Sequence, residues 1–322
     1  MTFAVFLYPR SLFPERLPSN TLFGAVCSAM ADLGLPVDSL IAAYDSGRSP
    51  FLLSSAFPFG TDGAGRRVCF VPKPILPTPR LSEREFDQGK VLKGIRWLES
   101  SIFSDIASGK VSFSDIPGLL ERKVYKAENH ALLPRSVEFS GMPVFSSRTH
   151  NSLDRLTNAS TAYYETEGVL FPEMSGMYCL VEAESEEVER DVRAAFLFLS
   201  DRGLGRKVSQ GFGSFSVEFS DEIPFVLPSS GEFVMSLSRY VPSNEEFSEF
   251  GRDMWYEMEE VRGVSADGMR RGRVRMLAEG SVFCARSGRS RFGRVVRVRE
   301  RPPVVEYGMM FPCPFEFSGG RR

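Results

Sequence analysis

The stretch Asp201-Arg202-Gly203-Leu204-Gly205-Arg206-Lys207-Val208-Ser209-Gln210-Gly211-Phe212-Gly213-Ser214-Phe215 decides how the chain is interpreted. It follows a helical pattern and runs into an alternating strand pattern. Glycine lets backbone N–H groups approach an anion closely, and Arg and Lys neutralise phosphate. The chain has no Walker A run, and a dinucleotide fingerprint would need a glycine at Val208 and the order strand, loop, helix. The stretch therefore predicts either a phosphate-binding loop of another kind or a flexible turn of an ordinary α+β domain.

The composition is that of a globular protein with one local excess of positive charge. The chain has 322 residues, 43% hydrophobic and 25% charged, with a net charge of −2. This length suits two domains, and the near-neutral charge means that any polyanion site must be local. Between Arg262 and Arg301, twelve arginines against three carboxylates give such an excess. The acidic run from Glu182 to Asp191 is typical of a solvated helix start, or it faces the arginines.

Several classes of protein are not favoured by the sequence. Five cysteines lie far apart without zinc-ligand spacing, which predicts reduced thiols in a cytoplasm and no metal. No run of about 18 apolar residues is present, and the start lacks the basic lead of a signal peptide, so we expect no membrane contact.

The order of predicted elements suggests the fold. Residues 2–8 are predicted to be a buried strand, 22–33 and 36–44 helices, 51–57 and 67–71 strands, 82–99 a helix, 168–182 a strand, 188–199 a helix and 215–219 a strand. The order strand, helix, two strands, insertion, strand, helix, strand fits an antiparallel ferredoxin-like sheet. A Pro- and Ser-containing linker at 224–231 divides the chain into domains 1–222 and 223–322.

The insertion, at about 121–167, is long, polar and rich in basic and aromatic residues. A loop of this length in a compact domain is either functional or disordered, and we expect an extended hairpin or a flexible arm. Its basic and aromatic residues include Arg148, His150, Arg155, Tyr163 and Tyr164.

The chain offers few groups for catalysis. His130 and His150 are the only histidines, and both lie in the insertion. His150 with Tyr163 or Lys126 would suit general acid–base catalysis. Serine-hydrolase spacing and a GGDD cyclase stretch are absent from the sequence, so we expect a binding protein without cofactor or catalytic residues.

Three segments resemble one known family. Pro18 to Ala25 resembles the S-D-T-L-F-G-A-L helix start of RAMP proteins, with Asn20 in place of Asp. The stretch ending Ser209-Gln210-Gly211-Phe212-Gly213-Ser214-Phe215 resembles their glycine-rich loop, and Tyr307 to Pro312 their closing Y-G-x-x-F-P strand. The order and spacing fit best the fourth Csm subunit of type III-A CRISPR effector complexes.

The resemblance implies an α+β fold of two tandem ferredoxin-like (RRM-like, RAMP) domains with a thumb-like insertion. It implies a non-catalytic subunit that caps the 5′ handle of the crRNA, meets the large polymerase-like subunit and the backbone RAMP subunit, and touches target RNA indirectly. The residues expected to grip the handle are Arg202, Gly203, Gly205, Arg206, Lys207, Ser209, Gln210, Gly211, Phe212 and Gly213, with Ser19, Asn20 and Thr21. The resemblance further implies that the thumb contacts RNA through Arg148, His150, Arg155, Tyr163 and Tyr164.

Two other functions remain open from the sequence. One is a metal-independent RAMP endoribonuclease that processes guide precursor RNA. The other is a protein scaffold whose Arg-rich segment pairs with acidic neighbours.

Overall fold

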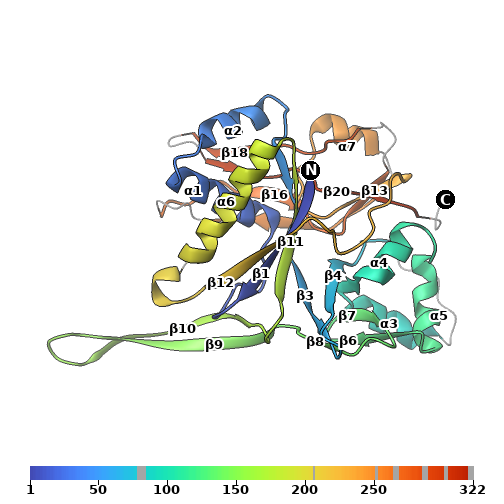
Figure 1. Cartoon of the computed structure of the whole chain (residues 1–322), viewed down its shortest axis with the longest axis horizontal. Coiled ribbons are helices and arrows are strands. Elements are labelled where there is room, and N and C mark those ends of the chain that lie inside the picture. The colour runs from blue at the N-terminus through green and yellow to red at the C-terminus, as the bar shows by residue number, and fades with distance from the viewer. Residues whose placement is uncertain are drawn as a thin grey trace.

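The apolar run at the start of the chain forms an inner strand of the largest sheet, next to its edge strand. β1 (Thr2–Pro9) pairs antiparallel with β11 (Gly176–Ala183) on one side and with β12 (Phe215–Ser220) on the other. The computed structural model describes residues 1–77, 85–205, 207–250, 253–263, 268–284, 289–300 and 304–317. Two helices, α1 (Ser19–Asp32) and α6 (Glu186–Arg202), pack together beside these strands (Figure 1).

The sheet continues from β11 to the other end of the N-terminal half, in the order β12-β1-β11-β3-β4-β5-β7-β6, with β2 on β11 and β8 on β3. The remaining strands are β2 (Phe51–Leu53), β3 (Phe57–Asp62), β4 (Arg67–Pro72), β5 (Trp97–Glu99), β6 (Tyr125–Glu128), β7 (Ala131–Pro134) and β8 (Phe139–Ser140). The helical segments are α2 (Val37–Asp45), α3 (Phe86–Gly94), α4 (Ser100–Ala107), η2 (Phe113–Asp115) and α5 (Ile116–Glu121). The fold is therefore of the mixed α+β class, as expected.

The helix predicted over 82–99 is wrong at its end. α3 stops at Gly94, Ile95 is extended, and residues 97–99 form strand β5. The carboxylate of Glu99 then caps α4 by accepting from the backbone N–H of Ser101 and Ile102. A capping side chain marks the start of a helix, so a new helix begins after Glu99. The helical periodicity of residues 82–99 therefore does not correspond to one continuous helix. Residues 82–84 lie outside the described part of the chain.

The insertion predicted at 121–167 divides into two parts. Residues 125–134 form the β6–β7 hairpin at the end of the sheet, because Ala131, Leu132 and Leu133 are buried there. The segment that projects from the body is the hairpin of β9 (Val144–Leu153) and β10 (Ser160–Leu170), drawn at the lower left of Figure 1. The extended hairpin is thus restricted to residues 144–170.

The C-terminal half builds a smaller sheet in the order β14-β17-β13-β20. Its elements are β13 (Phe233–Ser236), α7 (Asn244–Phe250), β14 (Met254–Trp255), β17 (Val282–Cys284) and β20 (Pro312–Phe315). Two hairpins accompany it, β15 (Met258–Val261) with β16 (Val274–Leu277), and β18 (Val296–Arg299) with β19 (Val304–Glu306).

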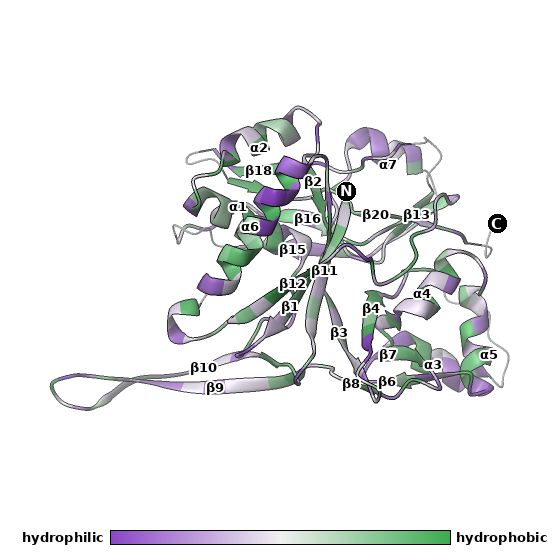
Figure 2. Cartoon of the chain, in the orientation of Figure 1, coloured by the Kyte–Doolittle hydropathy of each residue, from purple (hydrophilic) through white to green (hydrophobic). Residues whose placement is uncertain are grey.

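The two halves share one apolar core. The ring of Tyr307 stacks on Phe23 of α1 at 4.5 Å between centroids, and its hydroxyl accepts a hydrogen bond from the backbone N–H of Leu53. Burial raises the pKa of Tyr307. Apolar residues gather on the central strands, whereas the projecting hairpin and α6 carry more polar ones (Figure 2). Such a continuous core fixes the halves relative to each other.

Three sequence expectations can be compared with this fold. None of the five cysteines forms a disulfide. No described helix is both long and apolar enough to span a bilayer. Within the described residues, no group of three or more His, Cys, Asp or Glu is arranged to hold a metal ion.

Candidate nucleic-acid interface

The glycine-rich loop folds back on itself because its glycines adopt backbone angles that other residues avoid. Gly203, Gly205, Gly211 and Gly213 all have positive φ. The N–H of Leu204 donates to the carbonyl of Gly213 at 2.9 Å and closes the loop. A Cβ at Gly213 would lie 1.8 Å from the Leu204 carbonyl oxygen, so this position requires glycine.

The loop has a buried base and an exposed crest. Leu204 and Phe212 are buried, whereas Ser209 and Gln210, in the turn η3 (Val208–Gln210), are exposed. Arg202 precedes the loop and forms an ion pair with Asp32 at the end of α1. Arg206 lies outside the described residues.

The projecting hairpin turns one of its faces to this loop. His150 is the cross-strand partner of Tyr164, and Arg148 is the partner of Thr166, so their side chains share one face. Tyr163 lies on the opposite face, across from Asn151, and is 70% exposed. Of the two adjacent tyrosines, therefore, only Tyr164 faces the loop.

Loop and hairpin meet in a group of five side chains that we call the cation–aromatic cluster. Lys207 Nζ lies 4.5 Å from the centre of the Tyr164 ring, which stacks on His150 at 4.9 Å. His150 in turn lies 5.7 Å from Phe212, and Arg148 Cζ lies 5.9 Å from the Phe212 ring. The structure thus brings together five of the residues that the sequence proposed in two separate segments.

This cluster is suited to a single-stranded polyanion. Lys207 and Arg148 can neutralise phosphate, and both stay at the surface or partly exposed. The exposed Ser209 and Gln210 can reach base or sugar edges. Tyr164, which is 38% exposed, reaches the surface of the cluster, and stacking of a base on an exposed aromatic ring is worth about 1–3 kcal/mol.

The hairpin tip is a preformed turn beyond the cluster. Asp154 accepts hydrogen bonds from the backbone N–H of Leu156 and of Thr157, and these bonds lower the pKa of its carboxyl group. The turn presents Arg155 and the side chain of Leu156, which is 96% exposed. Hydrogen bonds within the turn therefore define the conformation of the tip, although the hairpin is exposed.

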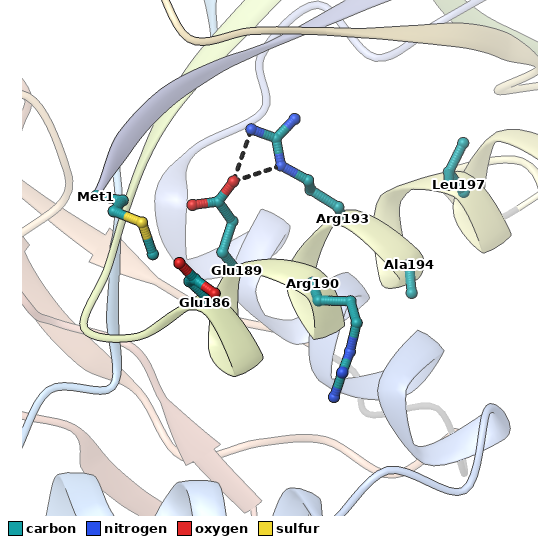
Figure 3. A pocket seen from close by; sticks show the side chains of 7 residues that line it. All are labelled: Met1, Glu186, Glu189, Arg190, Arg193, Ala194 and Leu197. Carbon is teal, nitrogen blue, oxygen red and sulfur yellow. Dashed lines mark hydrogen bonds and ion pairs between the residues drawn. The ribbon is translucent and has the colours of Figure 1, made fainter.

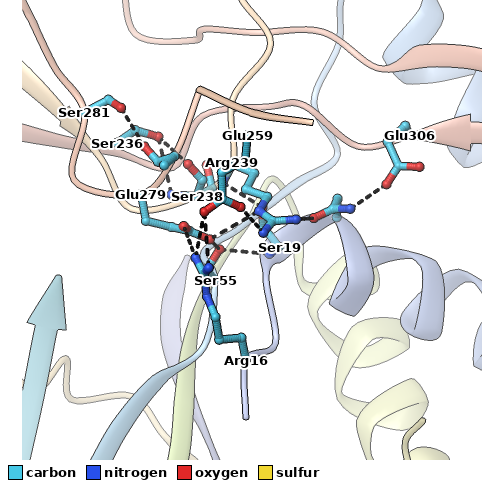
Figure 4. A network of polar contacts seen from close by, with 12 residues as sticks. Arg16, Ser19, Ser55, Ser236, Ser238, Arg239, Glu259, Glu279, Ser281 and Glu306 are labelled. Carbon is cyan, nitrogen blue, oxygen red and sulfur yellow. Dashed lines mark hydrogen bonds and ion pairs between the residues drawn. The ribbon is translucent and has the colours of Figure 1, made fainter. Parts of the chain in front are cut away.

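The start of α1, predicted to grip RNA together with the loop, has different surroundings. Ser19 is 0% and Asn20 5% exposed. Asn20 donates to Glu306 Oε1 at 2.5 Å, and the hydroxyl of Ser19 accepts from the backbone N–H of Arg239. The two residues belong to a polar network between the halves that also contains Ser55, Glu259, Glu279 and Arg16 (Figure 4). Thr21 is exposed.

Most described arginines of the 262–301 segment are paired within the chain. Arg291 binds Glu182 at 2.6 Å and Arg297 binds Asp45 at 2.6 Å, both in the N-terminal half. Other pairs join Arg262 and Arg273 to Glu260, Arg271 to Glu306 and Arg289 to Glu249. The acidic run itself opens α6, where the hydroxyl of Ser185 accepts from Val188 N. The local charge excess is therefore largely neutralised by intramolecular contacts.

The residues considered for catalysis are not assembled. His150 and Tyr163 point to opposite faces of the hairpin, and Lys126 pairs with Glu128 at the other end of the sheet. His130 Nδ1 lies 3.0 Å from the Gly94 carbonyl in a turn.

Two hollows lie outside the loop. One is a shallow surface beside α6 where Arg193 is held by Glu189 at 2.8 Å and lies over the Phe3 ring (Figure 3). The other is a cavity of about 510 Å³ between the halves, lined by Arg16, Lys73, Trp97 and Glu257 among others. Arg193 also binds Asp221, and Arg190 of the same hollow is 75% exposed and lies 3.7 Å from Asp191.

Sequence reasoning missed two contributors to the interface. Lys207 Nζ donates to the hydroxyl of Thr166 at 2.5 Å. The segment at 11–14 supports both elements: the Leu12 carbonyl accepts from Gly213 N, and Phe13 exchanges two backbone hydrogen bonds with Val169. In the sequence, the only sign of the role of Thr166 is its place in the alternating pattern of a strand. The backbone hydrogen bonds of residues 11–14 leave no mark in the sequence.

Comparisons with known proteins agree with one another. The family model of the CRISPR Csm4 C-terminal domain matches residues 229–315. The "CRISPR system Cms protein Csm4" of Thermococcus onnurineus (strain NA1) is 27% identical over 327 residues, covering 98% of each chain.

Solved structures also match the whole chain. A chain in the crystal structure of the Csm3-Csm4 subcomplex of the type III-A CRISPR-Cas interference complex gives a TM-score of 0.68 at 18% identity, covering 97% of this chain and 99% of that one. A chain in the crystal structure of the Csm1-Csm4 cassette with cA4 gives 0.62 at 24% identity, covering 99% and 100%. At these identities the structural matches establish the fold.

Proposed function

We propose that the chain is a Csm4-type protein, because its C-terminal residues match the Csm4 family model and its whole length is similar to a Csm4 protein, and that it is a non-catalytic RNA-binding subunit of a type III-A CRISPR effector in the cytoplasm. It caps the 5′ handle of the crRNA at the glycine-rich loop and the facing hairpin. The observation that carries this proposal is the cation–aromatic cluster, which joins an exposed loop to a projecting hairpin.

Strand order supports a division into two domains. In the N-terminal half, β12-β1-β11-β2 is an antiparallel arrangement with α1 after the first strand and α6 before the last. In the C-terminal half, β20-β13-β17-β14 repeats the same order, with α7 after its first strand. Two ferredoxin-like domains, 1–222 and 223–322, account for this repeated order, and the hairpin 144–170 is the thumb of the first.

The handle is held mainly through its backbone. Lys207 and Arg148 bind phosphates, Gly205 and Gly211 let the chain approach closely, and Ser209 and Gln210 contact sugar or base edges. The thumb, with Arg155 at its tip and Tyr163 on its outer face, follows the RNA beyond the handle. Ser19 and Asn20 support the site indirectly, through the network between the halves.

The protein partners are a Csm3-type backbone subunit and a Csm1-type large subunit. The structures that share this fold contain such subunits together with Csm4. A chain that binds the 5′ end of the guide RNA lies between the Csm3-type and Csm1-type subunits. It contacts target RNA only through the guide.

Absence of catalysis is supported by the placement of the candidate groups. General acid–base cleavage of RNA needs a base at the attacking 2′-OH and an acid at the leaving 5′-oxygen, so both groups must reach the same phosphodiester. His150 and Tyr163 face opposite ways. Incubation with guide precursor RNA is therefore expected to give no product, whereas cleavage that His150→Ala or His130→Ala abolishes would favour the endoribonuclease instead.

The binding function is tested by recovering the RNA. The chain is co-expressed with a CRISPR array and its effector partners, purified, and its RNA sequenced from the 5′ end. We expect RNAs that share a repeat-derived 5′ end and crosslink to this subunit through the loop. Crosslinks confined to other subunits would contradict the proposal.

A further inference from the structure

The ammonium group of Lys207 is held from the hairpin side by two groups. Its Nζ donates to the hydroxyl of Thr166 and lies over the ring of Tyr164. A lysine ammonium has three N–H donors and a flexible four-carbon stem. One hydrogen bond and one ring contact therefore fix the stem and leave two donors for another acceptor.

The hairpin that provides these contacts is itself fixed relative to the loop. Phe13 and Val169 exchange backbone hydrogen bonds of 2.9 Å at the hairpin's root, and the adjacent Leu12 accepts from Gly213 N at 2.9 Å. A Cβ at Gly168 would lie 2.7 Å from the Phe13 carbonyl oxygen, so the strands approach as closely as glycine allows. Thr166 and Tyr164 thus hold Lys207 from a rigid position.

In the cation–aromatic cluster, side chains of the glycine-rich loop contact side chains of the hairpin. Phe212 of the loop lies beside His150 and Arg148 of the hairpin, while Lys207 of the loop lies over Tyr164. Separation of hairpin and loop would break all of these contacts together.

We propose that Thr166 and Tyr164 are positioning residues that hold Lys207 as a preformed phosphate-binding group, so that loop and hairpin bind RNA as one site. This inference rests on the proposed function. A lysine whose rotamers are already restricted loses less conformational entropy when it binds a phosphodiester. Affinity gained in this way disappears when the holding contacts are removed, even though Lys207 remains.

A double-mutant cycle on handle RNA tests the inference. We expect Lys207→Ala to weaken binding about tenfold and Thr166→Val about fourfold, while the double variant binds as weakly as Lys207→Ala alone. The matched control is Thr149→Val, an exposed threonine on the opposite face of the same hairpin, which should leave affinity unchanged. Circular dichroism and thermal melting of each variant check that the fold is intact.

A second measurement needs no RNA. The rate at which a limiting acylating reagent modifies the Lys207 amine, followed by mass spectrometry, should rise about threefold in Thr166→Val and stay constant in Thr149→Val. An unchanged rate in Thr166→Val, or single-variant affinity losses that multiply in the double variant, would overturn the inference.

Different results would contradict the proposed function and the positioning role of Thr166. A chain that binds no handle RNA overturns the proposed function and the phosphate role of Lys207 with it. Handle binding that Lys207→Ala weakens and Thr166→Val leaves unchanged overturns only the positioning role.

Discussion

The start of α1 and the glycine-rich loop carry similar polar signals in the sequence, yet they lie in opposite environments. Ser19 and Asn20 are buried and bonded to Arg239 and Glu306, whereas the loop keeps Ser209 and Gln210 exposed above buried anchors. A buried polar group needs a partner inside the protein, and an exposed one remains available to a ligand. The comparison teaches that the α1 start joins the halves, while the loop and the hairpin keep polar side chains exposed to solvent.

The largest predicted effect concerns the network at α1. Glu306 is 2% exposed and binds both Asn20 and Arg271, the latter at 2.9 Å. Arg271→Ala leaves this carboxylate with one neutral partner and should lower the free energy of unfolding by about 3–5 kcal/mol.

The control for this change is Arg273→Ala. Arg273 belongs to the same Arg-rich segment but is 66% exposed and lies 3.8 Å from Glu260, so its loss should cost less than about 1 kcal/mol. Urea unfolding of both variants provides the comparison. Equal losses would mean that the network does not join the halves.

The loop should be sensitive to the shape of its base. Gly213→Ala combines a φ of +70° with a Cβ 1.8 Å from the Leu204 carbonyl oxygen, and should lower the free energy of unfolding by about 3 kcal/mol. Gly211→Ala, where φ is +81° and no atom lies within 4 Å, should cost only about 1 kcal/mol. Thermal unfolding measures both, and a reversed order would show that the loop is not closed at Gly213.

A smaller effect on stability is expected at His150 in the cation–aromatic cluster. The Nε2 atom of His150 is buried without a hydrogen-bond partner, while its ring stacks on Tyr164. His150→Phe keeps a ring and removes the unpaired atom, so the free energy of unfolding should rise by about 1 kcal/mol. His130→Phe, which loses the contact between Nδ1 and the Gly94 carbonyl, should instead lower it by about 1 kcal/mol. Chemical unfolding measures both variants. Changes in unfolding free energy of the same sign would contradict the packing of His150.

The smallest effect is local to the hairpin tip. Hydrogen bonds from the backbone N–H groups of Thr157 and Leu156 hold the pKa of Asp154 below its ordinary value of 3.8. A carboxyl group with a lowered pKa stabilises the turn above the unfolded value and loses that effect as pH falls through the folded pKa. Amide NMR signals of Leu156 and Thr157 should therefore shift together on acidification, and Asp154→Asn should remove this transition. Signals that stay constant in the native chain would contradict the turn.

Much of the fold could be predicted from sequence because its signals are local. The apolar run at 2–8, the helix at 188–199 and the glycine spacing at 203–213 each indicate their element. The contacts between segments could not be predicted. Nothing in the sequence shows that Asn20 meets Glu306 across 286 positions, or that Thr166 receives a hydrogen bond from Lys207. Likewise, the sequence of residues 125–134 looks polar because only Ala131, Leu132 and Leu133 of this hairpin are buried.

The salt dependence of handle binding by the native chain and by Lys207→Ala tests the central claim most directly. A phosphate contact made by Lys207 predicts weaker binding at every salt concentration and a slope of log affinity against log salt reduced by about one unit. Affinities and slopes that coincide for the two proteins would contradict the claim that the glycine-rich loop holds the RNA backbone.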